Sequence, residues 1–205
     1  SANTVDLANN SLDDQVLGLG GNDVITTGLG NNHVEGGAGN DDITTGLGLD
    51  TVYGGFGAVD PDDGDDTIST GRFDDYVLGA GGDDSIVAGA GDDFVQAGEG
   101  ADYVDGTGGG TNTLIAGRNA TGADTVVGGS GDETIYGGNL GADTQDKADD
   151  LDGGGGADFV FAAAGDDTAA GGSGDDIVHG GKGADSVDGS GGGDNTLYGG
   201  RSATG

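Results

Sequence analysis

The stretch Gly36–Thr44, with the sequence GGAGNDDIT, decides the fold of this chain. Its first four residues carry almost no side chain, and an asparagine, two aspartates and a branched aliphatic residue follow them. Consecutive glycines permit positive φ angles and a close approach of the backbone, which a tight turn requires. The last three residues alternate outward, inward and outward, as in a short strand with Ile43 facing the core. The stretch therefore predicts one tight turn followed by one short strand.

The same pattern recurs along the chain as a nonapeptide frame. When Asp41 is set at position six and Ile43 at position eight, the frame extends from Asn9 to Tyr198, and position eight is a branched aliphatic residue at every turn except Ala169. The segment TTGLG occurs at Thr26 and again at Thr44, two frames later. Two turns and two strands would thus form one 18-residue coil. We therefore predict an all-β fold, a parallel β-roll in which two sheets enclose a thin aliphatic core.

A longer repeat divides the chain further. The turns that depart from the nonapeptide length recur with an 83-residue spacing, so that GTGGGTNTLI at Gly106 returns as GSGGGDNTLY at Gly189. We expect a leading segment over residues 1–8 and a repeat region over residues 9–205. This region contains an 83-residue unit at 54–136 and a second, truncated copy at 137–205. The truncation favours an excerpt from a longer array.

The composition limits the possible partners. The chain of 205 residues has 52 Gly and 38 Asp or Glu against 5 Lys or Arg, for a net charge of −33. Such an acidic chain with few large apolar residues normally stays disordered unless something other than a large core stabilises it. Clustered bases for nucleic acid are lacking, no apolar run is long enough to span a membrane, and without cysteine there are no thiolate metal sites. Divalent cations are the natural counter-charge.

The repeats resemble those of a known family. The segments GGAGNDDIT, GGGGADFVF, GGSGDDIVH and GGKGADSVD match GGxGxDxUx, the calcium-binding nonapeptide of RTX proteins. The resemblance extends over essentially everything from Asn9 onward. It implies a right-handed parallel β-roll with several Ca²⁺ ions between stacked turns, export by a type I secretion system, and folding outside the cell.

The chemistry of the repeat also points to calcium. Ca²⁺ takes six to eight oxygen ligands, which glycine-rich turns supply as carbonyls and position six supplies as a carboxylate. Because successive turns lie at alternate edges of the roll, the position-six residues form two columns. We call them the first and the second edge. The first-edge column is Asp23, Asp41, Asp66, Asp84, Asp102, Asp124, Asp149, Asp167 and Asp185. The second-edge column is Asp14, Asn32, Asp50, Asp75, Asp93, Asn112, Glu133, Asp158, Asp176 and Asn195.

All the aspartates of both columns are candidate metal ligands. We predict a nearly continuous calcium ladder on the first edge and an interrupted one on the second, where asparagine or glutamate replaces aspartate. On the first edge, Lys147 stands where glycine is expected before Asp149, which would weaken that site.

Outward strand positions divide between the two faces in the same way. The face that belongs to the second edge carries most of the strand aromatics, among them Tyr76, Phe94, Phe159 and Phe161, whereas the other carries mainly small or acidic residues with Tyr103. An apolar patch of this kind suggests self-association or a surface partner. The simpler alternative is that aromatic residues suit strands in general.

No catalytic constellation is expected. His33 and His179 lie near opposite ends, and the periodic aspartate pairs suit metal turns better than a glycosidase dyad. We expect a non-enzymatic, extracellular structural segment of an RTX-like surface protein of the S-layer or adhesin type. The alternatives are the C-terminal secretion and folding module of a secreted RTX enzyme or toxin, and a polysaccharide-binding module.

Overall fold

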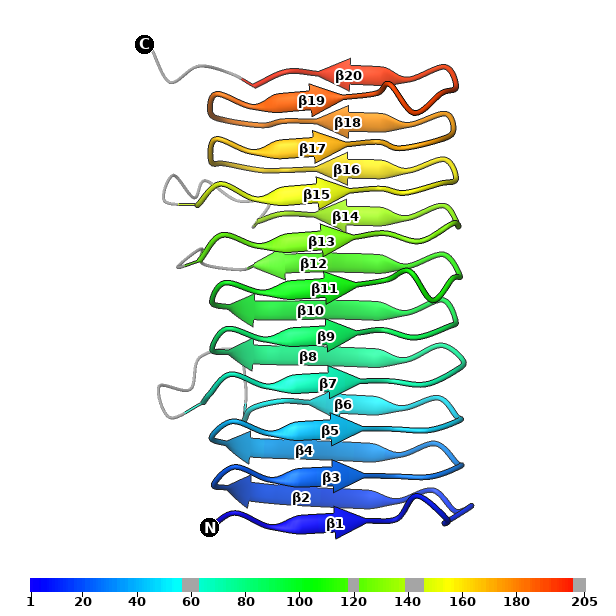
Figure 1. Ribbon diagram of the computed structural model, residues 1–205, viewed down its shortest axis with the longest axis vertical. Coiled ribbons are helices and arrows are strands. Elements are labelled where there is room, and N and C mark those ends of the chain that lie inside the picture. Colours follow the sequence, from blue (N-terminus) through cyan, green and yellow to red (C-terminus); the bar gives the residue numbers. More distant parts are fainter. Residues whose placement is uncertain (57–62, 118–121, 139–145, 201–205) are drawn as a thin grey trace.

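The fold consists of two ten-stranded parallel sheets stacked face to face, as the computed structural model shows (Figure 1). The structure describes residues 1–56, 63–117, 122–138 and 146–200. Sheet A contains the odd-numbered strands: β1 (Thr4–Asp6), β3 (Val24–Thr26), β5 (Asp42–Thr44), β7 (Thr67–Ser69), β9 (Ser85–Val87), β11 (Tyr103–Asp105), β13 (Thr125–Val127), β15 (Asp150–Asp152), β17 (Thr168–Ala170) and β19 (Ser186–Asp188). Sheet B contains the even-numbered strands: β2 (Gln15–Gly20), β4 (His33–Ala38), β6 (Thr51–Tyr53), β8 (Tyr76–Gly81), β10 (Phe94–Glu99), β12 (Thr113–Gly117), β14 (Thr134–Tyr136), β16 (Phe159–Phe161), β18 (Ile177–His179) and β20 (Thr196–Tyr198).

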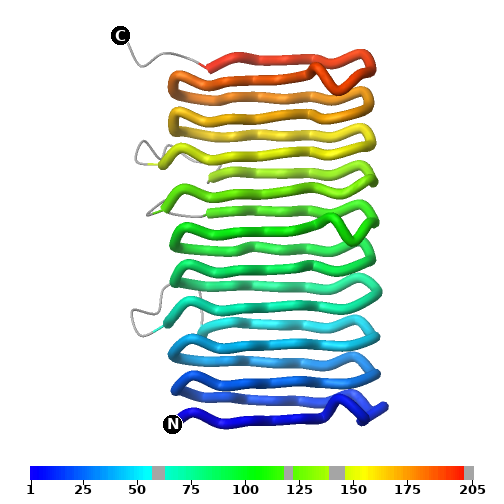
Figure 2. The backbone as a smooth tube through the Cα atoms, viewed as in Figure 1, coloured from blue at the N-terminus to red at the C-terminus, as the bar shows by residue number. Residues whose placement is uncertain are grey.

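The register of the strands follows the 18-residue coil. Ile25 pairs with Ile43 in sheet A, and Val34 pairs with Val52 in sheet B. Where the turn is longer, the pairing simply skips the extra residues, so that Ile43 pairs with Ile68 across the first long insertion. The described strands therefore follow one another as a single solenoid from β1 to β20 (Figure 2).

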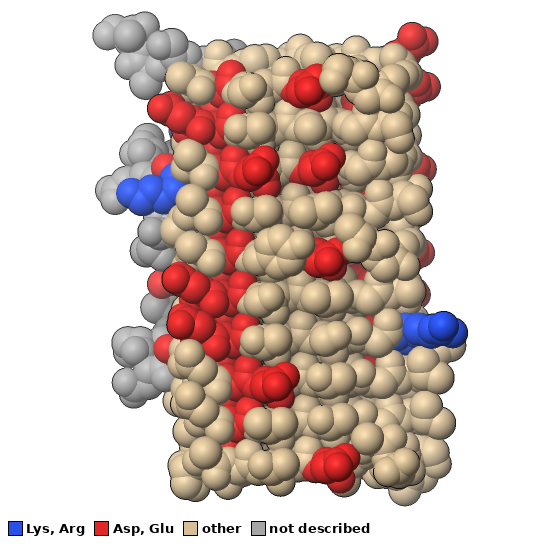
Figure 3. All heavy atoms as spheres, in the orientation of Figure 1, with Lys and Arg blue, Asp and Glu red and all other residues tan. Residues whose placement is uncertain are grey.

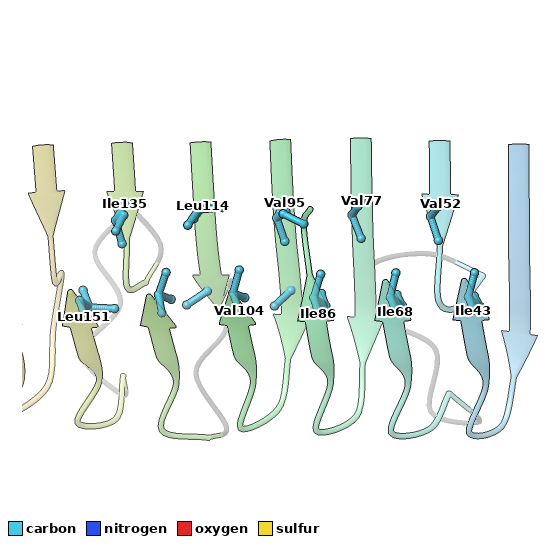
Figure 4. Packing of buried hydrophobic residues seen from close by; sticks show 14 of the residues in the cluster. Ile43, Val52, Ile68, Val77, Ile86, Val95, Val104, Leu114, Ile135 and Leu151 are labelled. Atoms are coloured by element: carbon cyan, nitrogen blue, oxygen red, sulfur yellow. The ribbon is translucent and has the colours of Figure 1, made fainter. Parts of the chain in front are cut away.

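The core is one row of aliphatic side chains from each sheet, and the two rows face each other (Figure 4). Ile68, Ile86 and Val104 come from sheet A, and Val77 and Val95 come from sheet B; all five are fully buried. The branched residue at position eight is the inward residue of each three-residue strand, because its two neighbours point to the opposite face of the pleat. Ala169 is buried at the same place, with a smaller side chain.

Glycine is required where the chain reverses direction between the sheets. Gly37, near the end of β4, and Gly39, directly after it, have φ angles of 107° and 109°, which residues with a Cβ rarely adopt. A Cβ added to Gly37 would lie 2.5 Å from the carbonyl oxygen of Leu19 in the preceding coil. The turns of one coil therefore stack directly on those of the next.

The predicted fold is confirmed: the chain is an all-β parallel roll with a coil of about 18 residues. The roll also begins earlier than the nonapeptide frame, because β1, within the leading segment 1–8, pairs with β3. Residues 201–205, the last of the predicted repeat region, and parts of the two long turns (57–62 and 139–145) lie outside the described residues. In the described part of the chain, no helix is long and apolar enough to cross a membrane.

Candidate metal centres at the turn edges

The position-six residues line the inside of both edges. Turns that lead from an even to an odd strand form the first edge, at the left of Figure 1, and the others form the second edge. The side chains of Asp41, Asp66 and Asp84 on the first edge are at most 2% exposed. Figure 3 shows a nearly continuous column of acidic residues along the side of the first edge. Each of the three aspartates stands directly before a strand, namely β5, β7 or β9.

One carboxylate oxygen at each turn binds the backbone of the preceding coil. The Oδ1 atom of Asp41 accepts a hydrogen bond from the N–H of Asp23 (2.7 Å), and the Oδ1 atom of Asp66 accepts one from the N–H of Asp41 (2.8 Å). The pattern continues without a break along the first edge to Asp185, which accepts from Asp167 (3.1 Å). Position six therefore links successive coils through its side chain.

The second carboxylate oxygen is buried and has no partner. This holds for the Oδ2 atom of every candidate aspartate on both edges: Asp14, Asp23, Asp41, Asp50, Asp66, Asp75, Asp84, Asp93, Asp102, Asp124, Asp149, Asp158, Asp167, Asp176 and Asp185. An unsatisfied buried polar atom is costly, and an unpaired buried charge is more so. A positively charged ligand beside each of these oxygens would offset that cost.

At turns that begin with glycine, such as those at Gly36 and Gly54 on the first edge, the unpaired oxygen lies close to a backbone carbonyl of the next coil. A Cβ added to Gly36 would lie 2.3 Å from Asp41 Oδ2 and 2.7 Å from the carbonyl oxygen of Gly54 in the next coil. At Gly54, the corresponding distances to Asp66 Oδ2 and the carbonyl oxygen of Gly79 are 2.2 and 2.4 Å. A carboxylate of one coil and a carbonyl of the next thus point at one small space. Ca²⁺ binds carboxylate and carbonyl oxygens, so the chemistry of this oxygen-only donor set fits Ca²⁺.

Acidic side chains alone do not complete a site. Among the described residues, no point gathers three or more acidic or histidine side chains in a metal-binding arrangement. Any bound ion would therefore take much of its shell from the backbone carbonyls that the glycines expose. Glycine thus has two roles: it permits the tight turn, and it leaves backbone carbonyl oxygens accessible as ligands.

The electrostatics of the row oppose ionisation when no cation is bound. Burial raises the pKa of Asp84 to about 9, and the charges of Asp102 and Asp66 add to the effect. Burial likewise raises the pKa of Asp66 and of Asp149 to about 8 from an ordinary value of 3.8. Stacked carboxylates in a low-dielectric edge repel one another, and a divalent cation between them would reverse that repulsion.

The second edge differs from the first at position one, the first residue of each repeat, as well as at position six. Thr27, Thr45 and Thr70 stand where the first edge has Gly36 or its equivalents, and all three are buried. Glycine returns further along this edge, where a Cβ on Gly153 or Gly171 would lie 2.6 or 2.5 Å from the Oδ2 atom of the turn's aspartate. At these later turns of the second edge, a glycine therefore lies beside the unpaired Oδ2 atom, as it does at Gly36 on the first edge.

Two turns depart from the consensus of the nonapeptide at or near position six. Asp149 keeps the common geometry despite Lys147, because its Oδ1 accepts from the N–H of Asp124 (3.0 Å) and its Oδ2 is buried and unpaired. The Lys147 side chain is exposed beside a groove of about 410 Å³ that Lys182 also lines. Glu133 is not among the aspartates that the sequence predicts as ligands, yet both of its carboxylate oxygens are buried without a partner. Its place at position six was the signal that could have found it.

The two histidines belong to the surface of sheet B. His33 Nε2 lies 3.1 Å from Glu35 Oε1, and its ring packs edge-on against Tyr53 at 5.5 Å between centroids. The His179 ring packs between Phe161 and Tyr198. Neither lies at the turn edges that hold the carboxylates.

Comparison with protein families identifies the repeat. The sequence profile of the RTX calcium-binding nonapeptide repeat, in four copies, matches the chain at residues 9–43, 26–58, 61–95, 78–112, 107–145, 142–169, 161–194 and 190–203. These overlapping matches cover nearly the whole chain. Comparison with curated proteins gives no match.

Replacing Asp84 with asparagine tests the role of the unpaired oxygen. The Asp84→Asn side chain keeps an oxygen to accept from the N–H of Asp66 but loses the negative charge beside Gly79. We expect the variant to bind about one calcium ion fewer, by equilibrium dialysis, and to need severalfold more calcium to fold. Asp83→Asn is the matched control, because Asp83 is exposed and accepts one backbone N–H from Ala101. Equal losses in both variants would contradict the assignment.

The raised pKa values predict a specific pH dependence. Without a cation, the folded carboxylates bind protons more tightly than the unfolded chain does. The cation-free roll should therefore be most stable near pH 4 and lose stability as the pH rises towards 9. Calcium must displace those protons, so its binding should strengthen over the same pH range and release protons at pH 7. Calorimetry in buffers of different ionisation enthalpy measures this release, and its absence would refute the predicted coupling.

Proposed function

Because the chain belongs to the RTX calcium-binding nonapeptide repeat family, we propose that it is a calcium-binding structural segment of a large extracellular surface protein, of the S-layer or adhesin type. It would remain unfolded during export, by a type I secretion system, and fold on meeting calcium outside the cell. The observation that carries the proposal is the row of buried, unpaired carboxylate oxygens along both edges.

The energetics of the roll support a dependence on metal. Most strands contribute one branched aliphatic residue to the core, and β10 and β12 add Ala97 and Ala116. The core is therefore only as thick as two facing aliphatic side chains. Such a core supplies little hydrophobic stabilisation for each ordered residue, while a charge of −33 opposes compaction. Ions that bind the folded roll and not the unfolded chain stabilise it by mass action. Extracellular calcium modules typically have dissociation constants of about 10⁻⁴–10⁻³ M, matched to a calcium-rich exterior.

We propose a structural and not a catalytic role for this segment. The alternative, a folding module of a secreted RTX enzyme or toxin, would require the same calcium-dependent roll. The surface of sheet B favours the structural role, because it offers the roll a means of contact beyond folding itself.

Aromatic residues form a stripe on the outward side of sheet B, which we call the aromatic face. Tyr76 and Phe94 stack with ring centroids 5.0 Å apart, and Tyr53 packs edge-on against Tyr76 at 6.3 Å. A second group lies one 83-residue unit later, where Tyr136 contacts Phe159 and Phe161 at 6.0 and 6.5 Å. Tyr53 and Tyr76 thus recur as Tyr136 and Phe159 at the 83-residue spacing, whereas Phe94 corresponds to Ile177.

The aromatic face is almost free of charge. At positions seven and nine of the even strands, the outward residues include one acid, Glu35. The same positions of the odd strands carry Asp6, Asp42, Asp105, Asp150, Asp152 and Asp188. On a chain of charge −33, the aromatic face is thus the side on which a second copy can approach without opposing carboxylates. Ten strands at about 4.8 Å, with three residues of about 3.3 Å each, give the face on the order of 500 Å² per copy, within the range of the largest apolar patches on soluble proteins, which are often functional.

We therefore propose self-association through this face as the contact that such a surface protein uses. A small pocket of about 190 Å³ beside it, lined by Glu35, Tyr53, Gly55, Phe56 and Leu78, favours a polysaccharide as the second candidate ligand. Aromatic rings beside a carboxylate suit the stacking and hydroxyl contacts of an uncharged sugar.

A calcium titration tests the primary proposal. Without calcium at pH 7.5, we expect a circular dichroism spectrum of a disordered chain, and on addition of millimolar calcium a cooperative change to β-structure. Magnesium at the same concentration should be less effective, because it demands octahedral geometry and keeps its waters. A chain that is equally folded in excess chelator and in calcium would refute the proposal.

The aromatic face has its own test. In calcium, the Tyr76→Ser, Phe94→Ser double variant should weaken self-association at least tenfold, as measured by analytical ultracentrifugation. Tyr103→Ser, on the opposite face and 42% exposed, should leave it unchanged. Equal association of both variants would exclude this face as the contact. A folded wild type that stays monomeric but is retained on an uncharged polysaccharide would favour the sugar instead.

A further inference from the structure

Three second-edge turns carry asparagine at position six and differ from all the others in one respect. At the carboxylate turns, an oxygen is left buried without a partner. At Asn32, Asn112 and Asn195, both polar side-chain atoms have hydrogen-bond partners. These turns therefore leave no side-chain atom of position six for a cation to satisfy.

The two ten-residue turns show the same arrangement. Asn112 Oδ1 accepts from the N–H of Asp93 (2.9 Å), and its Nδ2 donates to the carbonyl oxygen of Gly106, the first residue of the turn (3.2 Å). Asn195 Oδ1 accepts from the N–H of Asp176 (2.7 Å), and its Nδ2 donates to the first carbonyl, that of Gly189 (2.7 Å). The side-chain oxygen thus continues the series of hydrogen bonds between successive coils, and the side-chain nitrogen bonds the first carbonyl of its own turn.

In the nine-residue turn, the amide also reaches the next coil. Asn32 Nδ2 donates to the carbonyl oxygen of Gly30 and to Asp50 Oδ1, both at 2.9 Å, while Asn32 Oδ1 accepts from the N–H of Asp14 (3.1 Å). Asp50 thus has its Oδ1 atom shared between the backbone and the side chain of Asn32. This is a direct contact between stacked turns, of the kind that a bridging ion would otherwise make.

An amide nitrogen is a donor and offers no lone pair to a metal. Placed against turn carbonyls, its hydrogens take the acceptors that calcium would need and direct partial positive charge into the same space. We infer that the side-chain amides of Asn32, Asn112 and Asn195 take the place of a cation, so that these three turns close without metal and fix where calcium does not bind. This inference rests on the proposed function, because it concerns which turns of a calcium-binding roll are filled.

Two of the three asparagine turns recur at the longer spacing of the sequence. Asn112 and Asn195 occupy the same ten-residue turn at the 83-residue spacing, so the longer unit and its second copy each contain one such closure. All three asparagines lie on the second edge, whereas the first edge has aspartate throughout. The two edges would thus differ in their demand for calcium, with fixed interruptions on one edge only.

The test replaces the asparagine of one of these turns with aspartate, which can bind a metal ion. Asn112→Asp replaces the amide nitrogen by an oxygen and should raise the number of bound calcium ions by one per chain, by equilibrium dialysis and native mass spectrometry. Thr111→Asp is the matched control, because it adds the same charge at the neighbouring exposed position. It should add no tightly bound ion. An equal count for wild type and Asn112→Asp, when both are folded, would overturn the inference.

A measurement on the wild type keeps the inference testable if the variant does not fold. Anomalous scattering from crystals grown with a lanthanide or calcium should show ions along the first edge and none at the turns of Asn32, Asn112 and Asn195. An ion at any of these three turns would overturn the inference. A wild type that binds no calcium anywhere would instead refute the proposed function, so the two failures are distinguishable.

Discussion

The structure depends on the double use of one carboxylate at position six. One oxygen ties its coil to the backbone of the coil before it, and the other is left buried inside the turn, as at Asp41 and Asp66. The first contact fixes the stacking of the turns, and the stacking brings carbonyl oxygens of the next coil to the second oxygen. Fold and metal affinity therefore arise from the same side chain, and neither can be altered there without the other.

Sequence reasoning was sufficient for the elements that repeat. Branched aliphatic residues at position eight predict the core, since Ile43 and Ile68 can share one register only if extra residues are excluded from the coil. The pattern did not reveal the role of position one, where Thr45 and Gly36 place different atoms beside the carboxylate, because that difference depends on contacts between coils. The pattern also does not identify Glu133 as a ligand or β1 as a strand of the roll. Both occupy the expected places in the fold, but their residues differ from the consensus of the repeat.

Charge and apolar surface are separated around the roll. The carboxylates gather at the two edges and on the outward side of sheet A, and the aromatic side chains gather on sheet B. Because successive strands belong to opposite sheets, this separation requires the sequence to distinguish odd from even repeats. The asparagine turns and the threonines at position one obey the same rule, as both occur on the second edge. The nonapeptide is thus the repeat of the backbone, whereas the 18-residue coil is the repeat of the surface.

The longer period has a consequence for how such a rod can change in length. One 83-residue unit comprises eight turns, hence four whole coils, and adds about 19 Å at about 4.8 Å per coil. An even number of turns returns the chain to the edge from which it started, so duplication or deletion of a unit leaves every later side chain on its original side. An odd number would exchange the two faces beyond the junction. Genetic gain or loss of units would therefore adjust the length of such a roll in discrete steps while the orientation of its faces is preserved.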